Sequence, residues 1–126
     1  MLKELNLSGW NVSNWGTITA INNWLAYTNG LRKLKGLNTW TFLKSFTTIS
    51  QPNASPFLED FDGIPYSLNQ NYPNCQLLTH TSLVSMLNAL PTVTATRTLK
   101  LGATNLNKLT SEEKAIATNK GWTLAA

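Results

Sequence analysis

The same spacing of leucines occurs twice near the start of the chain, and it restricts the folds that the chain can adopt. Segment 2–7 reads Leu-Lys-Glu-Leu-Asn-Leu, and segment 31–37 repeats this leucine spacing 29 residues later with one residue inserted. Such a spacing predicts a short strand that turns alternate leucines inward before the chain bends away. Each copy would bury its leucines only against a neighbouring copy, so the pattern favours a repetitive fold.

The second half of the chain has strand-like segments at a shorter interval. We expect strands at 75–78, 98–101 and 122–124, whose leucines are 24 and 23 residues apart. Asn105 follows the strand at 98–101 in the way that Asn11 follows the first strand. An asparagine at this place is expected to bind backbone groups of the turn.

Helix signals lie between the strands. Thr79 opens a predicted helix that Pro91 ends, and segment 110–113 is a capping box that opens a second helix up to residue 118. A third, weaker helix is expected at about 17–27. Segment 50–73 contains four prolines and predicts an irregular insertion.

This order of elements predicts the α/β class and a single domain over residues 1–126. Short strands joined by long crossovers should pair in parallel, and right-handed crossovers would coil the chain into a solenoid with connecting helices. The proline-rich insertion at 50–73 would interrupt this solenoid.

Two parts of the sequence resemble a known group. Segment 2–13 resembles the BspA-like leucine-rich repeats of bacterial surface proteins, which follow the pattern LxxLxLSxWxxS. Segment 77–124 resembles the C-terminal leucine-rich segments of phage and prophage proteins of gut bacteria. The resemblance covers the first 40 and the last 50 residues. It implies a leucine-rich-repeat-like right-handed solenoid that serves as a binding or adhesion scaffold on a virion or cell surface, with no catalytic residues.

The composition points to the same kind of surface. Charged residues make up only 13% of the chain, while Asn, Thr and Ser number 15, 17 and 9. A polar but nearly uncharged surface suits a virion or an extracellular protein. The start of the chain shows no signal peptide, so we expect it to be cytoplasmic before release by lysis or particle assembly. It has no apolar run long enough to span a membrane.

The net charge of +4 is locally patterned. Four of the ten cations lie within fourteen residues: Arg32, Lys33, Lys35 and Lys44. Three acids form a separate group: Glu59, Asp60 and Asp62. Nucleic-acid binding would need more cations with a stacking platform on the same face. We therefore interpret the basic segment as a solvated strand edge.

Few residues could carry chemistry. Cys75 and His80 could form a nucleophile pair, but Cys75 occupies the place of an inward strand leucine and is expected to be a buried apolar residue. Segment 59–63 is similar to a fragment of a calcium loop, and an exposed acidic turn is the preferred interpretation. One cysteine and one histidine are too few for a disulfide or a zinc site. We expect no enzyme activity, cofactor or metal.

Tryptophan is a further candidate for binding. Trp10 and Trp40 occupy equivalent places in the repeated segment, and Trp24 lies on an apolar helix face, so these three are expected in the core. Trp15 is not constrained by the pattern and is a candidate for contact with a ligand.

Two functions remain open at this point. The first is a non-catalytic module that recognises a protein or glycan ligand on a phage virion or bacterial surface. The predicted ligand-binding residues are Glu4, Asn6, Ser8, Trp15, Lys33, Lys35, Gln76, Thr98, Lys100 and Thr123. The second is a structural virion component (a capsid, tail or fibre subunit) whose surface serves assembly. In either case we predict self-association, or contact with a neighbouring subunit, at Leu2, Leu5 and Leu7 of the first strand.

Overall fold

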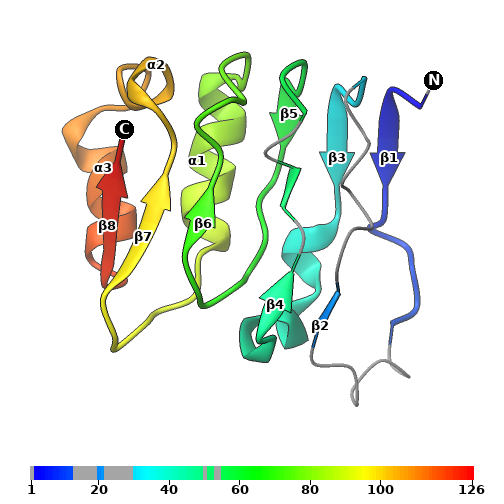
Figure 1. The fold of residues 1–126 in the computed structure, drawn as a ribbon, viewed down its shortest axis with the longest axis horizontal. Coiled ribbons are helices and arrows are strands. Elements are labelled where there is room, and N and C mark those ends of the chain that lie inside the picture. Colours follow the sequence, from blue (N-terminus) through cyan, green and yellow to red (C-terminus); the bar gives the residue numbers. More distant parts are fainter. Residues whose placement is uncertain (1, 13–19, 22–29, 50, 53–54) are drawn as a thin grey trace.

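The structure of the chain, a computed structural model, contains short strands and three helices (Figure 1), and it describes residues 2–12, 20–21, 30–49, 51–52 and 55–126. The strands are β1 (Glu4–Asn6), β2 (Ala20–Ile21), β3 (Lys33–Lys35), β4 (Thr48–Ile49), β5 (Asp60–Phe61), β6 (Gln70–Asn71), β7 (Arg97–Lys100) and β8 (Trp122–Ala125). The helices are α1 (His80–Ala89), α2 (Ala103–Leu106) and α3 (Ser111–Thr118), and two short 3₁₀ helices cover Leu37–Thr39 and Thr41–Ser45.

The first sheet consists of β1, β3 and β5 in that order, and its strands are parallel. Leu5 lies opposite Leu34, and Leu34 lies opposite Phe61. The equivalence of Leu5 and Leu34, which the repeated spacing predicts, is thus confirmed by the register. Leu34 and Phe61 are fully buried, whereas Leu5 on the outer strand is partly exposed.

A series of backbone hydrogen bonds links the residues directly before these strands. The N–H of Arg32 donates to the carbonyl of Lys3 at 2.7 Å, and the N–H of Glu59 donates to the carbonyl of Arg32 at 2.8 Å. The N–H of Thr79, at the start of α1, continues the series by donating to the carbonyl of Glu59 at 3.0 Å. These bonds hold β1, β3, β5 and α1 side by side.

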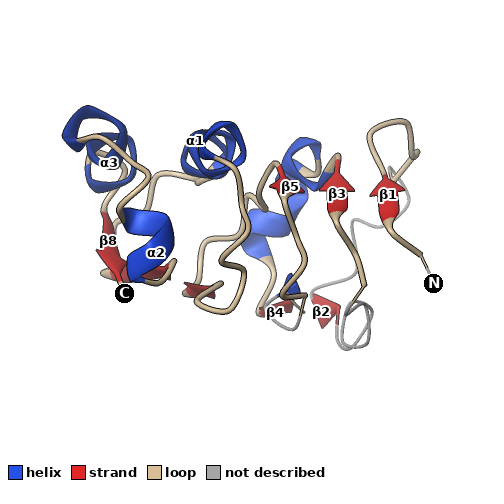
Figure 2. Ribbon diagram, turned by 90° about the horizontal axis from the view of Figure 1, so that it is seen from above, coloured by secondary structure: helices blue, strands red, loops and turns tan. Residues whose placement is uncertain are grey.

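The remaining strands form a two-stranded sheet, β2-β4, and a three-stranded sheet, β6-β7-β8, again all parallel. The side-chain amide of Gln51, two residues after β4, binds the backbone of β6 and the residue before it. It donates to the carbonyl of Asn69 at 3.1 Å and accepts from the N–H of Asn71 at 2.7 Å. Figure 2 shows two layers. In one layer, β1, β3 and β5 lie side by side and α1 and α3 follow them; the other layer contains β2, β4 and β8.

The predicted leucine-rich-repeat-like right-handed solenoid is wrong. It predicts one ladder of parallel strands, but the described strands pair in three separate sheets, β1-β3-β5, β2-β4 and β6-β7-β8. The first sheet ends at β5 because a helix takes the next place. The buried hydroxyl of Ser82 in α1 accepts from the N–H of Phe61 at 2.8 Å and donates to its carbonyl at 2.7 Å.

A row of leucines forms the framework of the layer that contains β1, β3, β5, α1 and α3. Each leucine lies two residues before the first residue of one of these elements: Leu2, Leu31, Leu58, Leu78 and Leu109. The middle three are 0% exposed and Leu109 is 7% exposed, whereas Leu2 at the end of the row is 56% exposed. Burial of one such side chain stabilises a fold by about 1.5–3 kcal/mol.

The described residues of segment 50–73 are mostly irregular, as its prolines predict, but the segment also supplies strands to two of the sheets. It contains β5 and β6, and it contributes several fully or nearly fully buried side chains to the core, among them Leu58, Ile64 and Tyr72. Its segment 58–61 reads Leu-Glu-Asp-Phe and has the same apolar spacing as segment 31–34, which leads into β3. The prolines lie outside the two strands, so they leave the ladder hydrogen bonds intact.

The two stronger helix predictions are confirmed, and two other predictions fail. Thr79 caps α1 by accepting from the N–H of Ser82, and the capping box of α3 is formed. The strand expected at 75–78 is a turn, and the strand of this region is β6 instead. Of the helix expected at 17–27, residues 20–21 form β2, and the rest lies outside the described residues.

The tryptophans divide between core and surface. Trp40 and Trp122 are each 2% exposed, and the indole N–H of Trp122 donates to the carbonyl of Pro91 at 2.8 Å. The core position predicted for Trp10 is wrong: this side chain is 56% exposed and lies against Trp40 with ring centroids 6.5 Å apart. Trp15 and Trp24 lie outside the described residues.

The capping box of α3 provides a test of the fold. The side chain of Thr110 accepts from the N–H of Glu113, and the Glu113 carboxylate accepts from the N–H of Thr110. Replacing Thr110 by Ala should lower the free energy of unfolding by about 1 kcal/mol. Thr110→Ser keeps the hydroxyl and should stay within a few tenths of wild type, as measured by urea unfolding. Equal stability of both variants would contradict a formed box.

Candidate functional site

The first sheet presents a face of alternating charges, which we call the charged face. Since Leu5, Leu34 and Phe61 turn toward the core, their neighbours in the strands point outward. The charged face comprises the charged residues among these neighbours, Glu4, Lys33, Lys35, Asp60 and Asp62, together with Lys3, Arg32 and Glu59, which lie directly before the strands. These residues come from three segments that are far apart in sequence and are brought together by the parallel register.

Ion pairs connect the cations of the central strand to both of its neighbours. Lys33 contacts Glu4 of β1 at 3.2 Å, and Lys35 contacts Asp60 of β5 at 2.8 Å. Arg32, just before β3, contacts Glu59 at 3.4 Å. Exposed pairs of this kind stabilise a fold by at most about 1 kcal/mol each, so their main effect here is to set the pattern of charge on the surface.

The charged face is electrically balanced. Four of its residues are cations and four are carboxylates, so the remaining six cations and two acids account for the chain's formal charge of +4. The basic segment that the sequence shows at 32–35 therefore does not act as a free positive patch. A nucleic-acid backbone would meet equal numbers of both charges here, which does not favour binding to phosphates.

Asp62 and Gly36 fix the turn that follows β3. Both carboxylate oxygens of Asp62 accept from the N–H of Gly36, at 3.2 and 3.0 Å. Burial raises the pKa of Asp62 above its ordinary value, and the hydrogen bond from Gly36 opposes that rise. Gly36 has φ +97°, and a Cβ at this position would lie 2.2 Å from the backbone nitrogen of Ser8. The glycine thus allows the turn to pack against the end of β1.

The acidic segment 59–63 is not arranged as a calcium loop. Glu59 contacts Arg32, Asp60 contacts Lys35, and Asp62 binds a backbone N–H, so each carboxylate has its own donor. Among the residues that the structure describes, no group of three or more His, Cys, Asp or Glu side chains could hold a metal ion.

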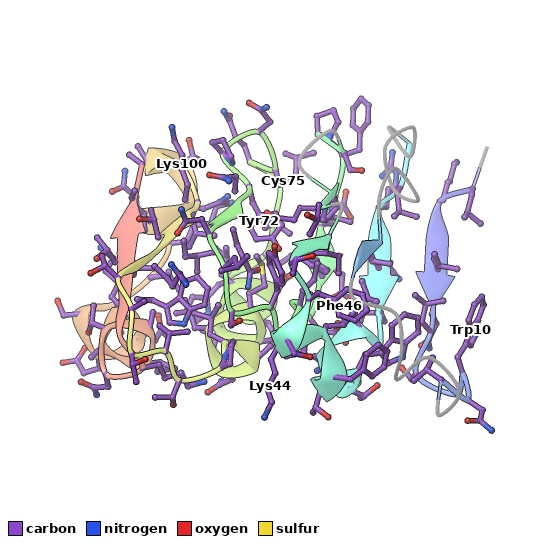
Figure 3. All side chains as sticks on the ribbon, turned by 60° about the horizontal axis from the view of Figure 1, so that its bottom comes forward. Trp10, Lys44, Phe46, Tyr72, Cys75 and Lys100 are labelled. Atoms are coloured by element: carbon purple, nitrogen blue, oxygen red, sulfur yellow. The ribbon has the colours of Figure 1, made fainter. Side chains whose placement is uncertain are left out.

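Among the described residues, four large apolar side chains are about half exposed, and two of them flank β1. Leu2 and Trp10, each 56% exposed, lie just before and just after this strand, and Figure 3 shows Trp10 at the β1 end of the molecule. Phe57 and Leu77, each 51% exposed, precede β5 and α1. The end of the sheet at β1 thus combines exposed apolar groups with the charged face.

Of the predicted ligand-binding residues, the structure brings together those of the first two repeated segments. Glu4 and Asn6 lie opposite Lys33 and Lys35 in the β1-β3 ladder, and Ser8 donates to the side-chain oxygen of Asn6 through its N–H at 3.0 Å and its hydroxyl at 2.6 Å. These five residues form one surface with Asp60 of β5, which contacts Lys35.

The other predicted residues lie elsewhere. Thr98 and Lys100 are in β7 and Thr123 is in β8, which belong to a different sheet from the charged face. Gln76 is exposed in the turn before α1, where its carbonyl accepts from the Lys108 ammonium at 2.8 Å. The prediction for Trp15 lies outside the described residues.

Of the residues predicted for assembly, Leu2 is exposed, Leu5 is half-buried and Leu7 is fully buried. Four further residues at this surface were not predicted from the sequence: Arg32, Glu59, Asp60 and Trp10. The match between segments 58–61 and 31–34 is the signal that could have placed the two acids beside the cations.

Cys75 and His80 do not form a nucleophile pair. The Cys75 thiol is fully buried and donates to the carbonyl of Pro52 at 3.3 Å, and burial raises its pKa to about 11. The ring of the exposed His80 contacts the Glu113 carboxylate at 2.8 Å. Asn105, as predicted, binds backbone groups, because its amide donates to the carbonyls of Cys75 and Leu101.

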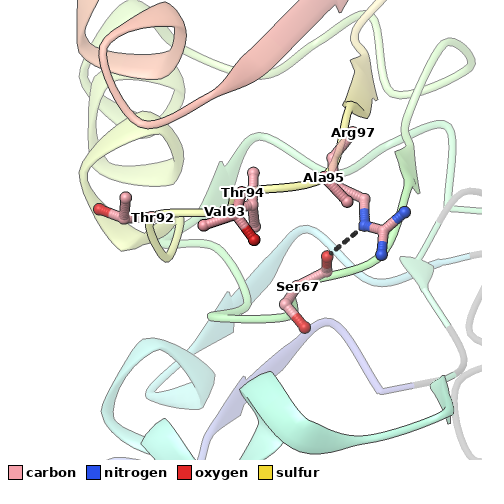
Figure 4. A pocket seen from close by; sticks show the side chains of 6 residues that line it. All are labelled: Ser67, Thr92, Val93, Thr94, Ala95 and Arg97. Carbon is pink, nitrogen blue, oxygen red and sulfur yellow. Dashed lines mark hydrogen bonds between the residues drawn. The ribbon is translucent and has the colours of Figure 1, made fainter.

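A shallow hollow of about 240 Å³ lies on another part of the surface (Figure 4). The side chain of Arg97 at its border donates to the carbonyl of Ser67 at 2.9 Å. The residues that line it are Ser67, Thr92, Val93, Thr94, Ala95 and Arg97. The lining has Ser and Thr hydroxyls but no carboxylate or imidazole that could act as a general base for them.

The chain matches no protein-family model, no curated protein and no solved structure in the comparisons with known proteins. No helix within the described ranges has the length and apolar character needed to cross a membrane.

The environment of Cys75 predicts low thiol reactivity. At pH 8 the folded protein should react with a disulfide reagent such as DTNB far more slowly than the urea-unfolded protein, because the thiol is buried and its pKa is raised to about 11. Equal rates in the two states would contradict the buried position.

The contacts of Glu113 predict a pH-dependent contribution to stability. Its pKa lies below the ordinary value of 4.5 because it accepts hydrogen bonds from the N–H of Thr110 and from His80. This contribution is therefore complete above pH 4.5 and is lost as the pH falls through the pKa of the folded state. Glu113→Gln preserves a capping side chain but removes the charge. Urea unfolding should show a wild-type advantage at pH 7 that disappears by about pH 2; a constant difference would contradict this role.

Proposed function

We propose that this chain is a non-catalytic protein-interaction module that binds its partner at the β1 end of the first sheet. The observation that carries the proposal is the exposure of Leu2 and Trp10, which flank β1 beside the charged face. Apolar anchors next to polar groups are typical of protein interfaces, and tryptophan is enriched among the residues that dominate their binding energy.

A protein suits this surface better than a glycan. The charged face has paired cations and carboxylates, which can select a partner of complementary charge pattern. Leu2 is aliphatic and suits an apolar side chain rather than a sugar ring. The low charged fraction of 13% supports a place of action on a virion or bacterial surface, which stays a prediction.

The alternative function is a structural virion subunit that uses the same surface for assembly. It is favoured by one observation, the exposure of Leu2 in a row whose other leucines are buried. In that case the partner at β1 would be another copy of this chain or a neighbouring subunit.

A peptide-display experiment tests the proposed module. Random extended peptides are selected on the wild-type protein, and their affinities are then measured on Leu2→Ser/Trp10→Ser. We expect at least about a tenfold loss of affinity on this variant, because the two apolar anchors are removed. The matched control is Phe57→Ser/Leu77→Ser, which removes two apolar side chains of similar exposure elsewhere and should retain binding.

Two results would count against the module. One is that no selected peptide distinguishes the wild type from the β1 variant, and the other is that the control variant loses as much affinity. Sedimentation of the wild type over a range of concentrations separates the alternative. If the mass of the wild type rises with concentration while the β1 variant stays at the mass of a monomer, the surface serves assembly instead.

A further inference from the structure

β1 uses one of its two edges in the first sheet. Among the described strands its only neighbour is β3. The carbonyl of Lys3 and the N–H of Leu7 both bond to that neighbour, at 2.7 Å to Arg32 and 2.8 Å to Lys35. Backbone groups of successive strand residues point to opposite edges, so those of Glu4 point to the open edge. Such an edge is a template for an added strand.

The opposite end of the same sheet shows how an edge is closed in this fold. There, α1 covers β5, and the Ser82 hydroxyl binds both backbone groups of Phe61. Leu78 enters the leucine row beside Leu58, and both are fully buried. At the β1 end, Leu2 is 56% exposed. A leucine on an added strand in the same register would lie about 4.8 Å further along the row and would cover Leu2.

The charges along the register define which strand fits. Across the three strands at the level of Glu4, the sign of the charge alternates, because Glu4 lies opposite Lys33 and Lys33 lies opposite Asp60. A cation on the outer side of Glu4 continues this alternation. At the preceding position, Lys3 adjoins Arg32, which has the same charge, so an acid is favoured on the outer side of Lys3.

A second copy of β1 does not meet these requirements. Its segment 2–5 reads Leu-Lys-Glu-Leu, so a parallel pairing in the same register would place Lys opposite Lys3 and Glu opposite Glu4. Like charges directly opposite one another destabilise a pair of strands. The complementary order is Leu-acid-cation-Leu.

From these three features we infer that β1 binds an extended peptide segment of another protein as an added parallel strand, with the sequence Leu-(Asp/Glu)-(Lys/Arg)-Leu opposite residues 2–5. This inference rests on the proposed interaction module and names the chemistry of its partner. Main-chain hydrogen bonds at the open edge hold the strand, the leucine row takes its apolar side chains, and the charges select its sequence.

Two peptides of identical composition test the charge pattern. The first is Ser-Leu-Glu-Lys-Leu-Asn-Leu-Ser, and the second, Ser-Leu-Lys-Glu-Leu-Asn-Leu-Ser, exchanges the two charges and reproduces residues 2–8 of this chain. Their affinities for the full chain are measured by fluorescence anisotropy of an attached dye. We expect the first peptide to bind about tenfold more tightly than the second.

A charge exchange in the protein should reverse this preference. In Lys3→Glu/Glu4→Lys the second peptide should bind more tightly than the first, and circular dichroism checks that the variant is folded. The matched control, Glu112→Lys/Lys114→Glu, exchanges two charges on α3 and should keep the wild-type preference.

N-methylated peptides test the backbone contacts. In the parallel arrangement the N–H of the second leucine lies opposite the carbonyl of Glu4, so methylating that nitrogen should abolish binding. Methylating the preceding lysine nitrogen, which points away from β1, should not.

Equal affinities of the two peptides, no binding of either, or no reversal in the exchanged variant would overturn the inference. A wild-type dimer that Leu2→Asp dissociates would assign the edge to a second copy and would also overturn it. If the display experiment selects peptides that need Leu2 and Trp10 but lack this pattern, the interaction module stands and the added parallel strand does not.

Discussion

The row of leucines at the entrances of β1, β3, β5, α1 and α3 is the constraint on which the layer depends. Every leucine of the row except Leu2 is buried, and the backbone hydrogen bonds from Arg32 to Lys3, from Glu59 to Arg32 and from Thr79 to Glu59 align the starts of β1, β3, β5 and α1. Because the row is shared, strands and helices can occupy equivalent places in one layer. The residue after the leucine differs between the two cases. Before a strand it is charged, and before a helix it is a threonine that caps the first turn.

The charged face follows from this arrangement. Once the leucine row fixes the register, β3 lies between β1 and β5, and its lysines meet an acid on each side. Each ion pair contributes little to stability in water. Together they produce a balanced surface in which the two edges of the sheet differ. The β5 edge is closed by α1 through Ser82, and the β1 edge carries the exposed Leu2. That asymmetry makes the β1 end the candidate binding surface.

The sequence was most informative where local interactions decide the structure. The caps of α1 and α3 were predicted correctly because a threonine and its own first turn satisfy one another without help from distant residues. The role of Asn105 followed in the same way from its place after a strand. Predictions failed where a short apolar segment had to be assigned without such signals. Segment 75–78 was expected to be a strand and is a turn, and the strands β5 and β6 were hidden among the prolines of segment 50–73.

By itself, the sequence determined the parallel equivalence of Leu5 and Leu34, the two capped helices and a single buried thiol, since each depends on residue spacing or on side-chain chemistry close in the chain. Only the tertiary structure decided that the first sheet ends at β5, because α1 occupies the place beside that strand. It also decided that the basic segment of β3 is neutralised, because its acids come from β1 and β5. The exposure of Trp10 has the same origin. Trp10 and Trp40 have equivalent places in the sequence, but only Trp40 is buried, because Trp10 follows the outermost strand of the sheet.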